Sequence, residues 1–341
     1  MFQASATLFF YAISPVHAGA GTALGVIDNP IQRERHTDFP IIAGSGIKGA
    51  IRHHFWAEAA GNPPEPVQSE DATDKDGTKP KSKVHTLVER IFGPDSQSGE
   101  GFAGAISFGD AQLVAFPVRS IKGGFVYATC PLALARLQRL LTITGQQADW
   151  TFPDNSTLKD KALCAGAEPL LNADTLVLET FTYKAKTNDD VKALAKWLAQ
   201  AVFGKDKEGD YFHDKLANEL VVLSDDDLSY FVRNATVVEP HVRINDETGT
   251  ADDGGLFYTE NLPPETLLAT ALFASKERTS DNQRAQARAY EAEDVMRFVL
   301  EGDGQKHQGL LDSKVIQLGG DATTGRGLVQ VSALQEQGGQ P

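Results

Sequence analysis

The sequence is poor in cysteine and has no long apolar run. Its two cysteines, Cys130 and Cys164, stand 34 residues apart and match neither a CxxC pair nor a zinc-ligand spacing. This spacing argues against a cysteine-based metal site and favours a reducing, cytoplasmic setting. No stretch approaches the ~20 consecutive apolar residues of a membrane-spanning helix. A signal peptide would need a basic residue near its start, but the first basic residue is Arg33. We therefore expect a cytoplasmic protein with no membrane partner.

Basic residues are also scarce. The 341 residues include 46 acidic and 32 basic side chains, which gives a formal net charge of −14 at pH 7. A protein that neutralises many phosphates needs lysine and arginine, so this balance argues at first against a nucleic-acid partner. The deficit is uneven, because residues 1–60 carry four bases and four acids whereas residues 205–227 carry three lysines and eight acids. The net charge therefore describes the solvent-facing bulk of the chain and not a binding groove.

The order of the expected elements favours an α+β fold. Residues 4–14 are apolar at both parities, which predicts a strand buried on both faces. Strand patterns return at residues 314–318 and 328–333, and strands at both ends with helices between favour α+β over an alternating parallel sheet. Other patterns predict a strand over 104–118, helices over 131–142, 188–203 and 283–300, a helix capped by Ser224 with Asp227, a mobile insertion over 61–83 and a projecting hairpin over 235–262.

Two glycine clusters resemble nucleotide-binding motifs without meeting their requirements. Gly44, Gly46 and Gly49 satisfy GxGxxG at a helix start, but the acidic residue that a dinucleotide site needs about twenty residues later falls in the proline-rich insertion. The loop 320–327 imitates a P-loop, but it has Arg326 in place of the lysine and enters a strand instead of a helix. A nucleotide-cofactor enzyme therefore remains only a remote alternative.

Both clusters place exposed backbone N–H groups beside cations. Lys48 and Arg52 lie four residues apart on one helical face just after Ser45, and a helix N-terminus with added cations binds phosphate. Gly325 and Arg326 offer the same chemistry in a loop. Each cluster alone is better explained as a solvated face or a turn, but their combination favours a long phosphate chain as the ligand.

Asp28 lies in a long loop, bounded by glycine and proline, that also carries Arg33 and Arg35. A lone aspartate in such a loop is usually a turn former. Beside bound phosphate it could instead coordinate a magnesium ion or orient an attacking hydroxyl. His17 could serve as an acid or base nearby, although a structural histidine is the commoner outcome.

Three segments near the start of the chain carry recognisable motifs. They are residues 8–21, residues 24–36 with their Pro-Ile-Gln-Arg-Glu run, and residues 40–52 with their Gly-Ser-x-x-Lys-Gly core. Together they resemble the CRISPR-associated RAMP superfamily, and within it the backbone subunits of type III-B, Cmr-type effector complexes. The glycine loop 318–327 and residues 248–264 are similar to two further family features, a glycine-rich loop and a late hairpin.

The resemblance implies a single RAMP domain over 1–341 with an RRM-like (ferredoxin-like) palm and inserted thumb-hairpin and lid elements. It implies that copies stack into a filament along the guide RNA, and that the thumb displaces a base pair of the guide–target duplex at regular intervals. Asp28 then matches the residue that supports metal-dependent cleavage, with Mg²⁺ as the expected cofactor and Asp28 as its ligand. His17, Tyr258 and Glu260 are possible catalytic support. The expected RNA contacts are Arg33, Arg35, Ser45, Lys48, Arg52, Gly325 and Arg326.

The implied partners are the CRISPR guide RNA, single-stranded target RNA, further copies of the chain, other Cmr-type RAMP subunits, the small helical subunit and the large polymerase-like subunit. Displacing a nucleotide lets its neighbour's 2′-hydroxyl reach in-line geometry with its own phosphate, which stacked A-form RNA prevents. The main hypothesis is an RNA-guided endoribonuclease subunit acting in antiviral defence. Its closest rival is a scaffold that binds guide RNA and cuts nothing.

Overall fold

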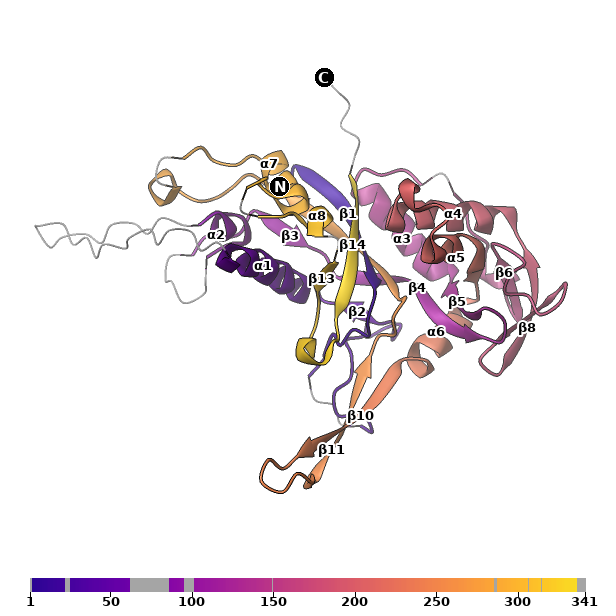
Figure 1. Cartoon of the computed structure of the whole chain (residues 1–341). Helices are drawn as coiled ribbons and strands as arrows, with labels where there is room; N and C mark the ends of the chain where they lie inside the picture. Colours follow the sequence, from indigo (N-terminus) through magenta and orange to yellow (C-terminus); the bar gives the residue numbers. More distant parts are fainter. Residues whose placement is uncertain are drawn as a thin grey trace, which may run out of the picture.

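The computed structural model describes residues 2–21, 25–61, 86–94, 101–148, 150–284, 287–305, 307–313 and 315–335 (Figure 1). The predicted insertion over 61–83 lies outside the described residues except for Gly61. No helix in the described part of the chain is long and apolar enough to cross a membrane.

The elements follow the chain as strands, α-helices and 3-10 turns (η). They are β1 (Ala4–Ala12), β2 (Ile41–Ile42), α1 (Gly44–Gly61), α2 (Leu87–Phe92), β3 (Ile106–Phe108), β4 (Ala111–Ser120), β5 (Gly124–Thr129), α3 (Pro131–Ile143), η1 (Asn155–Thr157), β6 (Lys161–Cys164), β7 (Thr175–Leu178), β8 (Phe181–Thr187), α4 (Asp189–Phe203), η2 (Lys205–Lys207), α5 (Tyr211–Glu219), β9 (Leu220–Val222), α6 (Asp225–Asn234), β10 (Val237–Ile244), β11 (Ala251–Asn261), β12 (Leu267–Ala274), η3 (Asp281–Arg284), α7 (Ala292–Glu301), α8 (Leu310–Ser313), β13 (Val315–Gln317), η4 (Ala322–Thr324) and β14 (Leu328–Gln335).

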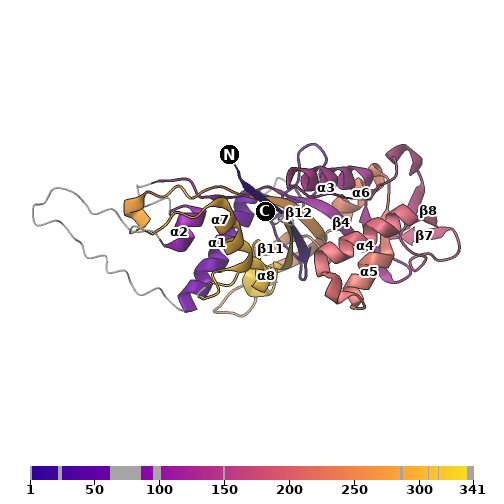
Figure 2. The same ribbon diagram turned by 90° about the horizontal axis from the view of Figure 1, so that it is seen from above.

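A long mixed sheet forms the body of the molecule. Its strand order is β13-β14-β1-β12-β4-β5-β9-β6-β8-β7, and β3 and β2 pair additionally with β12 and β4. The N-terminal strand β1 pairs antiparallel with both β12 and the C-terminal strand β14. Viewed from above, α1, α2 and α7 occupy one end of the molecule, and α3 to α6 the other (Figure 2). The α+β class predicted from the sequence is therefore confirmed.

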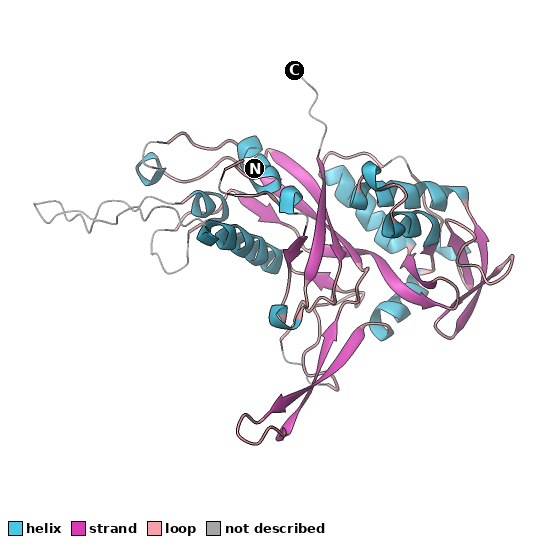
Figure 3. Cartoon of the chain, viewed as in Figure 1, coloured by secondary structure: helices cyan, strands magenta, loops and turns pink. Residues whose placement is uncertain are grey.

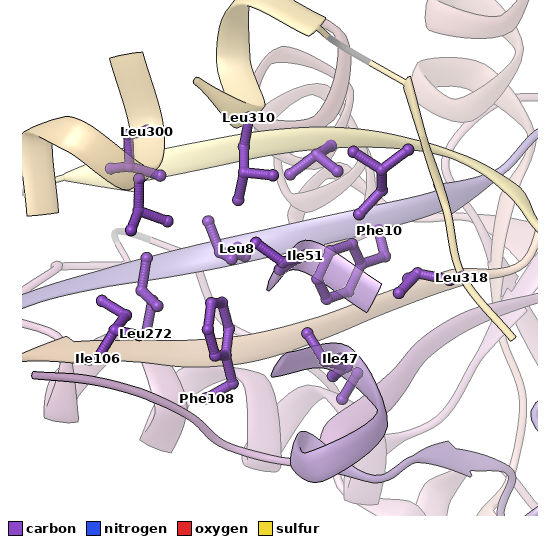
Figure 4. Close-up of a cluster of buried hydrophobic side chains, with 14 of the residues drawn as sticks. Leu8, Phe10, Ile47, Ile51, Ile106, Phe108, Leu272, Leu300, Leu310 and Leu318 are labelled. Atoms are coloured by element: carbon purple, nitrogen blue, oxygen red, sulfur yellow. The ribbon is translucent and has the colours of Figure 1, made fainter. Parts of the chain in front are cut away.

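The two faces of β1 pack against different helices. Leu8 and Phe10 point into a core with Ile47 and Ile51 of α1, and Leu300 of α7 belongs to the same cluster (Figure 4). On the other face, Phe9 and Tyr11 belong to a second cluster with residues of α3 and α4. Side chains alternate across a strand, so apolar residues at both parities bury both faces. The predicted doubly buried strand is therefore confirmed.

Two predicted elements have different boundaries in the structure. The helix expected over 283–300 begins only at Ala292, because the Tyr290 backbone N–H donates to Glu277 (3.0 Å) and a capping box of Glu291 and Asp294 starts α7. The strand expected over 104–118 is interrupted between β3 and β4. There Asp110 turns its carboxylate to the Gly44 backbone N–H at the start of α1, at 2.8 Å.

The pair β10 and β11 forms a two-stranded hairpin separate from the main sheet. It extends away from the body of the molecule (Figures 1 and 3). The pairing runs from Val237 opposite Asn261 to Ile244 opposite Ala251, with an irregularity near Val242. The base of this hairpin lies beside the loop that carries Asp28.

Candidate functional site

Asp28 is exposed, and its loop is attached to the hairpin. Its carboxylate Oδ2 accepts a hydrogen bond from the Tyr258 backbone N–H at 2.8 Å. The Asn29 backbone N–H donates to the Tyr258 carbonyl at 3.0 Å, and Asn29 accepts from the Glu260 N–H at 2.9 Å. The loop therefore forms a parallel bridge to β11, with Asn29 opposite Thr259. This pairing fixes an accessible carboxylate against the hairpin backbone.

Glu260 is buried beneath this loop. Its Oε1 atom accepts from the guanidinium of Arg33 at 2.6 Å and from the hydroxyl of Thr236 at 2.8 Å. Its Oε2 atom accepts from the Ile31 backbone N–H at 3.1 Å. Because the residue is only 3% exposed, these bonds anchor the Asp28 loop from inside the protein. The arrangement favours a positioning role for Glu260.

Arg33, expected to contact RNA, is directed inward. Its Nη1 atom donates to the carbonyls of Asp38 and Val232 at 2.9 and 3.0 Å, and its Nη2 atom binds Glu260. Both terminal nitrogens therefore have partners within the chain. Arg35, two residues later, is exposed.

His17 joins the hairpin to the glycine-rich loop. Its Nδ1 atom lies 2.7 Å from the Glu260 carbonyl oxygen, and its own carbonyl accepts from the Gly320 N–H at 2.9 Å. A carbonyl oxygen only accepts, so Nδ1 carries the proton, and in the neutral ring Nε2 is left as the proton acceptor. His17 thus presents a basic nitrogen at the base of the hairpin.

The glycine-rich loop 319–327 packs closely on the chain around His17. Gly319 has a φ of +83°, and a Cβ atom there would lie 2.4 Å from the His17 carbonyl oxygen. Gly325 also has a positive φ, but its surroundings are open. Arg326 forms a two-point ion pair with Glu239 of β10, with N–O distances of 2.6 and 3.0 Å. A phosphate that binds Arg326 would have to displace this carboxylate.

A separate basic cluster lies at the start of α1. Lys48 and Arg52 project from this helix, and Arg278 joins them from the segment after β12. Burial lowers the pKa of Lys48, and the like charges of Arg52 and Arg278 lower it further. Like charges held together favour an anionic ligand between them. Arg278 was missed by sequence reasoning, and its only signal was the Lys-Glu-Arg run that follows a strand.

Gly44, at the start of α1 before this cluster, serves close packing of the helix. A Cβ atom on Gly44 would lie 2.3 Å from the Phe108 carbonyl oxygen, and the Asp110 carboxylate caps its N–H. A carboxylate at the helix N-terminus opposes a dinucleotide pyrophosphate at the same place. Ser45 and Gly46 remain exposed in the first turn. The cluster is therefore suited to a phosphate that approaches from the side of Lys48 and Arg52.

The predicted site residues thus fall into two groups. Asp28, His17, Tyr258, Glu260, Arg33, Arg326 and Gly325 surround the hairpin base, whereas Ser45, Lys48 and Arg52 belong to the first turns of α1. The described residues contain no group of three or more histidine, cysteine or acidic side chains that could hold a metal ion. A magnesium ion at Asp28 would therefore need RNA phosphates and water as its remaining ligands, and Mg²⁺ commonly binds in this way.

Known proteins match this chain over almost its whole length. The RAMP superfamily model matches residues 9–330. The CRISPR system Cmr endoribonuclease Cmr4 of Pyrococcus furiosus is 32% identical over 325 residues, which cover 94% of this chain and 93% of the relative. The CMR subunit Cmr4 of Saccharolobus solfataricus is 21% identical and covers 96% of both chains.

Solved structures have the same fold. Oligomeric Cmr4 from Pyrococcus furiosus superimposes with a TM-score of 0.62 at 26% identity, covering 98% of this chain and 99% of that one. A subunit of the type III-B Cmr-beta complex bound to cognate target RNA gives a TM-score of 0.65 at 19% identity, with 97% and 98% covered. On the family match and the 32% identity, this chain belongs to the RAMP superfamily.

Proposed function

We propose that this chain is the backbone subunit of a type III-B, RNA-guided effector that binds guide RNA and cleaves complementary target RNA. The endoribonuclease name of the relative at 32% identity supports the activity, and the solved oligomer of a similar chain supports stacking of copies. The observation that carries the proposal is the attachment of the exposed Asp28 carboxylate to the hairpin by the 2.8 Å bond from Tyr258.

Strand order supports an RRM-like palm. The strands β14, β1, β12 and β3 lie side by side in that order, and each pairs antiparallel with its neighbour. In chain order, β1, α1, β3, β12, α7 and β14 follow the strand–helix–strand, strand–helix–strand pattern of a ferredoxin-like unit. α1 and α7 pack on the same face of β1. On this proposal, the remaining strands and helices are insertions into the palm.

The hairpin is suited to the thumb role. Val238, Val242 and Ile244 of β10 and Leu256 of β11 are between 43% and 55% exposed. An apolar side chain that enters a duplex partly unstacks it and costs a few kcal/mol, which contacts to the distorted strand repay. The hairpin therefore supplies a wedge against the guide–target duplex.

The geometry suggests how the chain's residues act on the displaced strand. Distortion at the hairpin lets a 2′-hydroxyl approach its own phosphate in line. On this proposal, the Asp28 carboxylate orients that hydroxyl and the Nε2 atom of His17 accepts its proton. The 2′-oxygen then bonds to phosphorus to give a 2′,3′-cyclic phosphate, the P–O5′ bond breaks, and the departing 5′-oxygen takes a proton from water. Glu260 maintains the loop from beneath. A divalent metal held by Asp28 and RNA phosphates would neutralise the charge that develops on the phosphate.

Lys48, Arg52 and Arg278 are proposed to grip the guide backbone. These three side chains form the basic cluster described above. Contacts from such cations to phosphates do not depend on base sequence, as expected for a subunit that must bind guides of any sequence. Neighbouring copies and the other Cmr-type subunits would continue the track along the guide.

The experiment is cleavage of complementary RNA by the assembled effector, with and without Mg²⁺. The proposal predicts a ladder of products at regular spacing that requires complementarity and disappears with a chelator. A complex that holds guide and target for hours without any product would show the non-catalytic scaffold instead. A non-complementary RNA of equal length is the control.

A further inference from the structure

A cavity of about 820 Å³ lies where β1 and β14 meet the end of α4 and the start of α5. Its walls come from the strands β1, β13 and β14, from the end of α4, the turn η2 and the start of α5, from α8, and from the turn before β12 that carries Glu265. None of its lining residues belongs to the hairpin base or to the basic cluster. The proposed cleavage reaction therefore leaves this cavity without a role.

Aromatic rings gather at this cavity. Tyr11 meets Phe203 edge to face with 4.9 Å between ring centroids, and Phe212 lies 6.3 Å from Tyr11. Tyr211 contacts Phe212 at 5.2 Å. Tyr211 and Phe212 are 68% and 42% exposed, although large aromatic side chains normally bury most of their area. Their exposed ring faces can attract a cation.

A carboxylate lies at the inner wall of the cavity. Glu265 accepts a hydrogen bond from the Tyr11 hydroxyl, which is 2.8 Å from the Tyr127 hydroxyl. The backbone of Glu265 has a φ of +71°, a left-handed conformation that is strained for a residue with a Cβ atom. Strain of this kind persists where a side chain must be held in one place.

The charges around the cavity are mainly negative. Asp206 and Asp210 line it together with Glu265, and among the described residues that line it Lys207 is the one lysine or arginine. Two polar atoms of lining residues, the Nε2 atom of His213 and the Oγ atom of Ser332, are buried without a hydrogen-bond partner in the described structure. A ligand with donor groups could therefore satisfy acceptors that the protein leaves unpaired.

We propose that this cavity binds an organic cation, a guanidinium or alkylammonium group on an apolar stem, with its charge directed to Glu265 and its stem against Tyr11, Phe203 and Phe212. The aromatic rings supply apolar area and π faces, and the carboxylates supply the counter-charge. An anion would meet three carboxylates, and a neutral apolar molecule would leave Glu265 without a charged partner. The same chemistry is found in an arginine side chain of a protein partner and in a free polyamine.

The test is calorimetric titration of the purified full-length chain. The probes are N-acetyl-leucyl-argininamide for a protein side chain, spermidine for a free polyamine, and n-butylguanidinium against neutral n-butylurea for the charge itself. We expect n-butylguanidinium to bind at least roughly tenfold more tightly than n-butylurea, as a charge-assisted contact supplies. The tighter of the first two probes identifies the source of the cation.

Two variants and a control locate the site. Glu265→Gln should weaken n-butylguanidinium binding at least roughly tenfold, and Phe212→Ala roughly three- to tenfold. Phe212 is 42% exposed, so its replacement tests the cavity without risk to the core. Glu208→Gln removes an acid of the same segment that does not line the cavity, and should leave binding unchanged.

Binding should also depend on pH. Burial raises the pKa of Glu265 to about 7, so its carboxyl is neutral at about pH 5.5 and ionised at about pH 8.5. Cation affinity should therefore rise through neutrality, and this rise should be much smaller in Glu265→Gln. His213 also lines the cavity, and it is retained in Glu265→Gln, so the difference between the two proteins isolates the part of Glu265. The other titratable groups around Glu265 are Tyr11, Tyr127, Asp206, Lys207, Asp210 and Tyr211.

Three results would overturn the proposal. They are equal affinity for n-butylurea and n-butylguanidinium, unchanged affinity in both Glu265→Gln and Phe212→Ala, and no saturable binding of any cationic probe at millimolar concentration.

Discussion

Asp28 and Glu260 are two carboxylates at one hairpin base with opposite environments. Asp28 is exposed and bound to a backbone N–H, whereas Glu260 is 3% exposed and paired with Arg33. An exposed carboxylate can meet RNA, and a buried, fully bonded one cannot do so without losing its partners. On the proposed function, the difference in exposure favours direct chemistry for Asp28 and a supporting role for Glu260.

Glu260→Gln should destabilise the protein by about 2–4 kcal/mol, because it leaves Arg33 partly buried without its counter-charge. Denaturant unfolding measures this change. Glu179→Gln is the matched control, since its ion pair with Arg119 is exposed and should contribute less than about 1 kcal/mol. The folded Glu260 variant should still cleave RNA. Complete loss of cleavage without loss of stability would instead give Glu260 a direct catalytic part.

Replacing Lys48, Arg52 or Arg278 with alanine should weaken guide binding without changing which guide is bound. Each lost phosphate contact should reduce the slope of log affinity against log salt by about 0.7–1. Filter binding at several salt concentrations measures this slope. Lys196→Ala, an exposed lysine on α4, should leave the slope unchanged. Equal slopes for all four variants would mean that the cluster does not contact the guide.

At the scale of elements, boundaries that depend on local sequence were predicted well, whereas a boundary that depends on a long-range contact was not. Ser224 accepts from the Asp227 N–H and caps α6, and the helices α3 and α4 begin and end within a residue or so of their predicted limits. These features depend on neighbours three or four residues away. The late start of α7 depends on Glu277, which is thirteen residues from Tyr290, and no helical period encodes it.

The glycine-rich loop shows how an element can depend on close approach. Gly319→Ala should destabilise the protein by at least about 2 kcal/mol, because it combines a positive φ with a contact of 2.4 Å to the His17 carbonyl. Gly325→Ala shares the positive φ in open surroundings and should cost only about 1 kcal/mol. Thermal unfolding compares the two. Equal losses would show that the contact with His17 is not tight.

At the scale of the whole molecule, the sequence predicted the α+β class and the family, but not how the site is assembled. The ion pair of Arg33 with Glu260 joins residues 227 positions apart, and the cavity around Glu265 joins β1 to α5 and β14. Such contacts arise only when the sheet forms. The net charge of −14 was likewise a poor guide to the binding partner, because Lys48, Arg52 and Arg278 form a basic cluster within an acidic chain.

The most direct test of the central proposal is cleavage-site mapping on complementary RNA by an effector assembled with Asp28→Asn. The account predicts that all regularly spaced products disappear together, while guide binding and assembly are unchanged. Asp38→Asn, which changes another exposed acid of the same loop, should leave every product in place. Residual cutting by the Asp28 variant at the same regular positions would contradict the account.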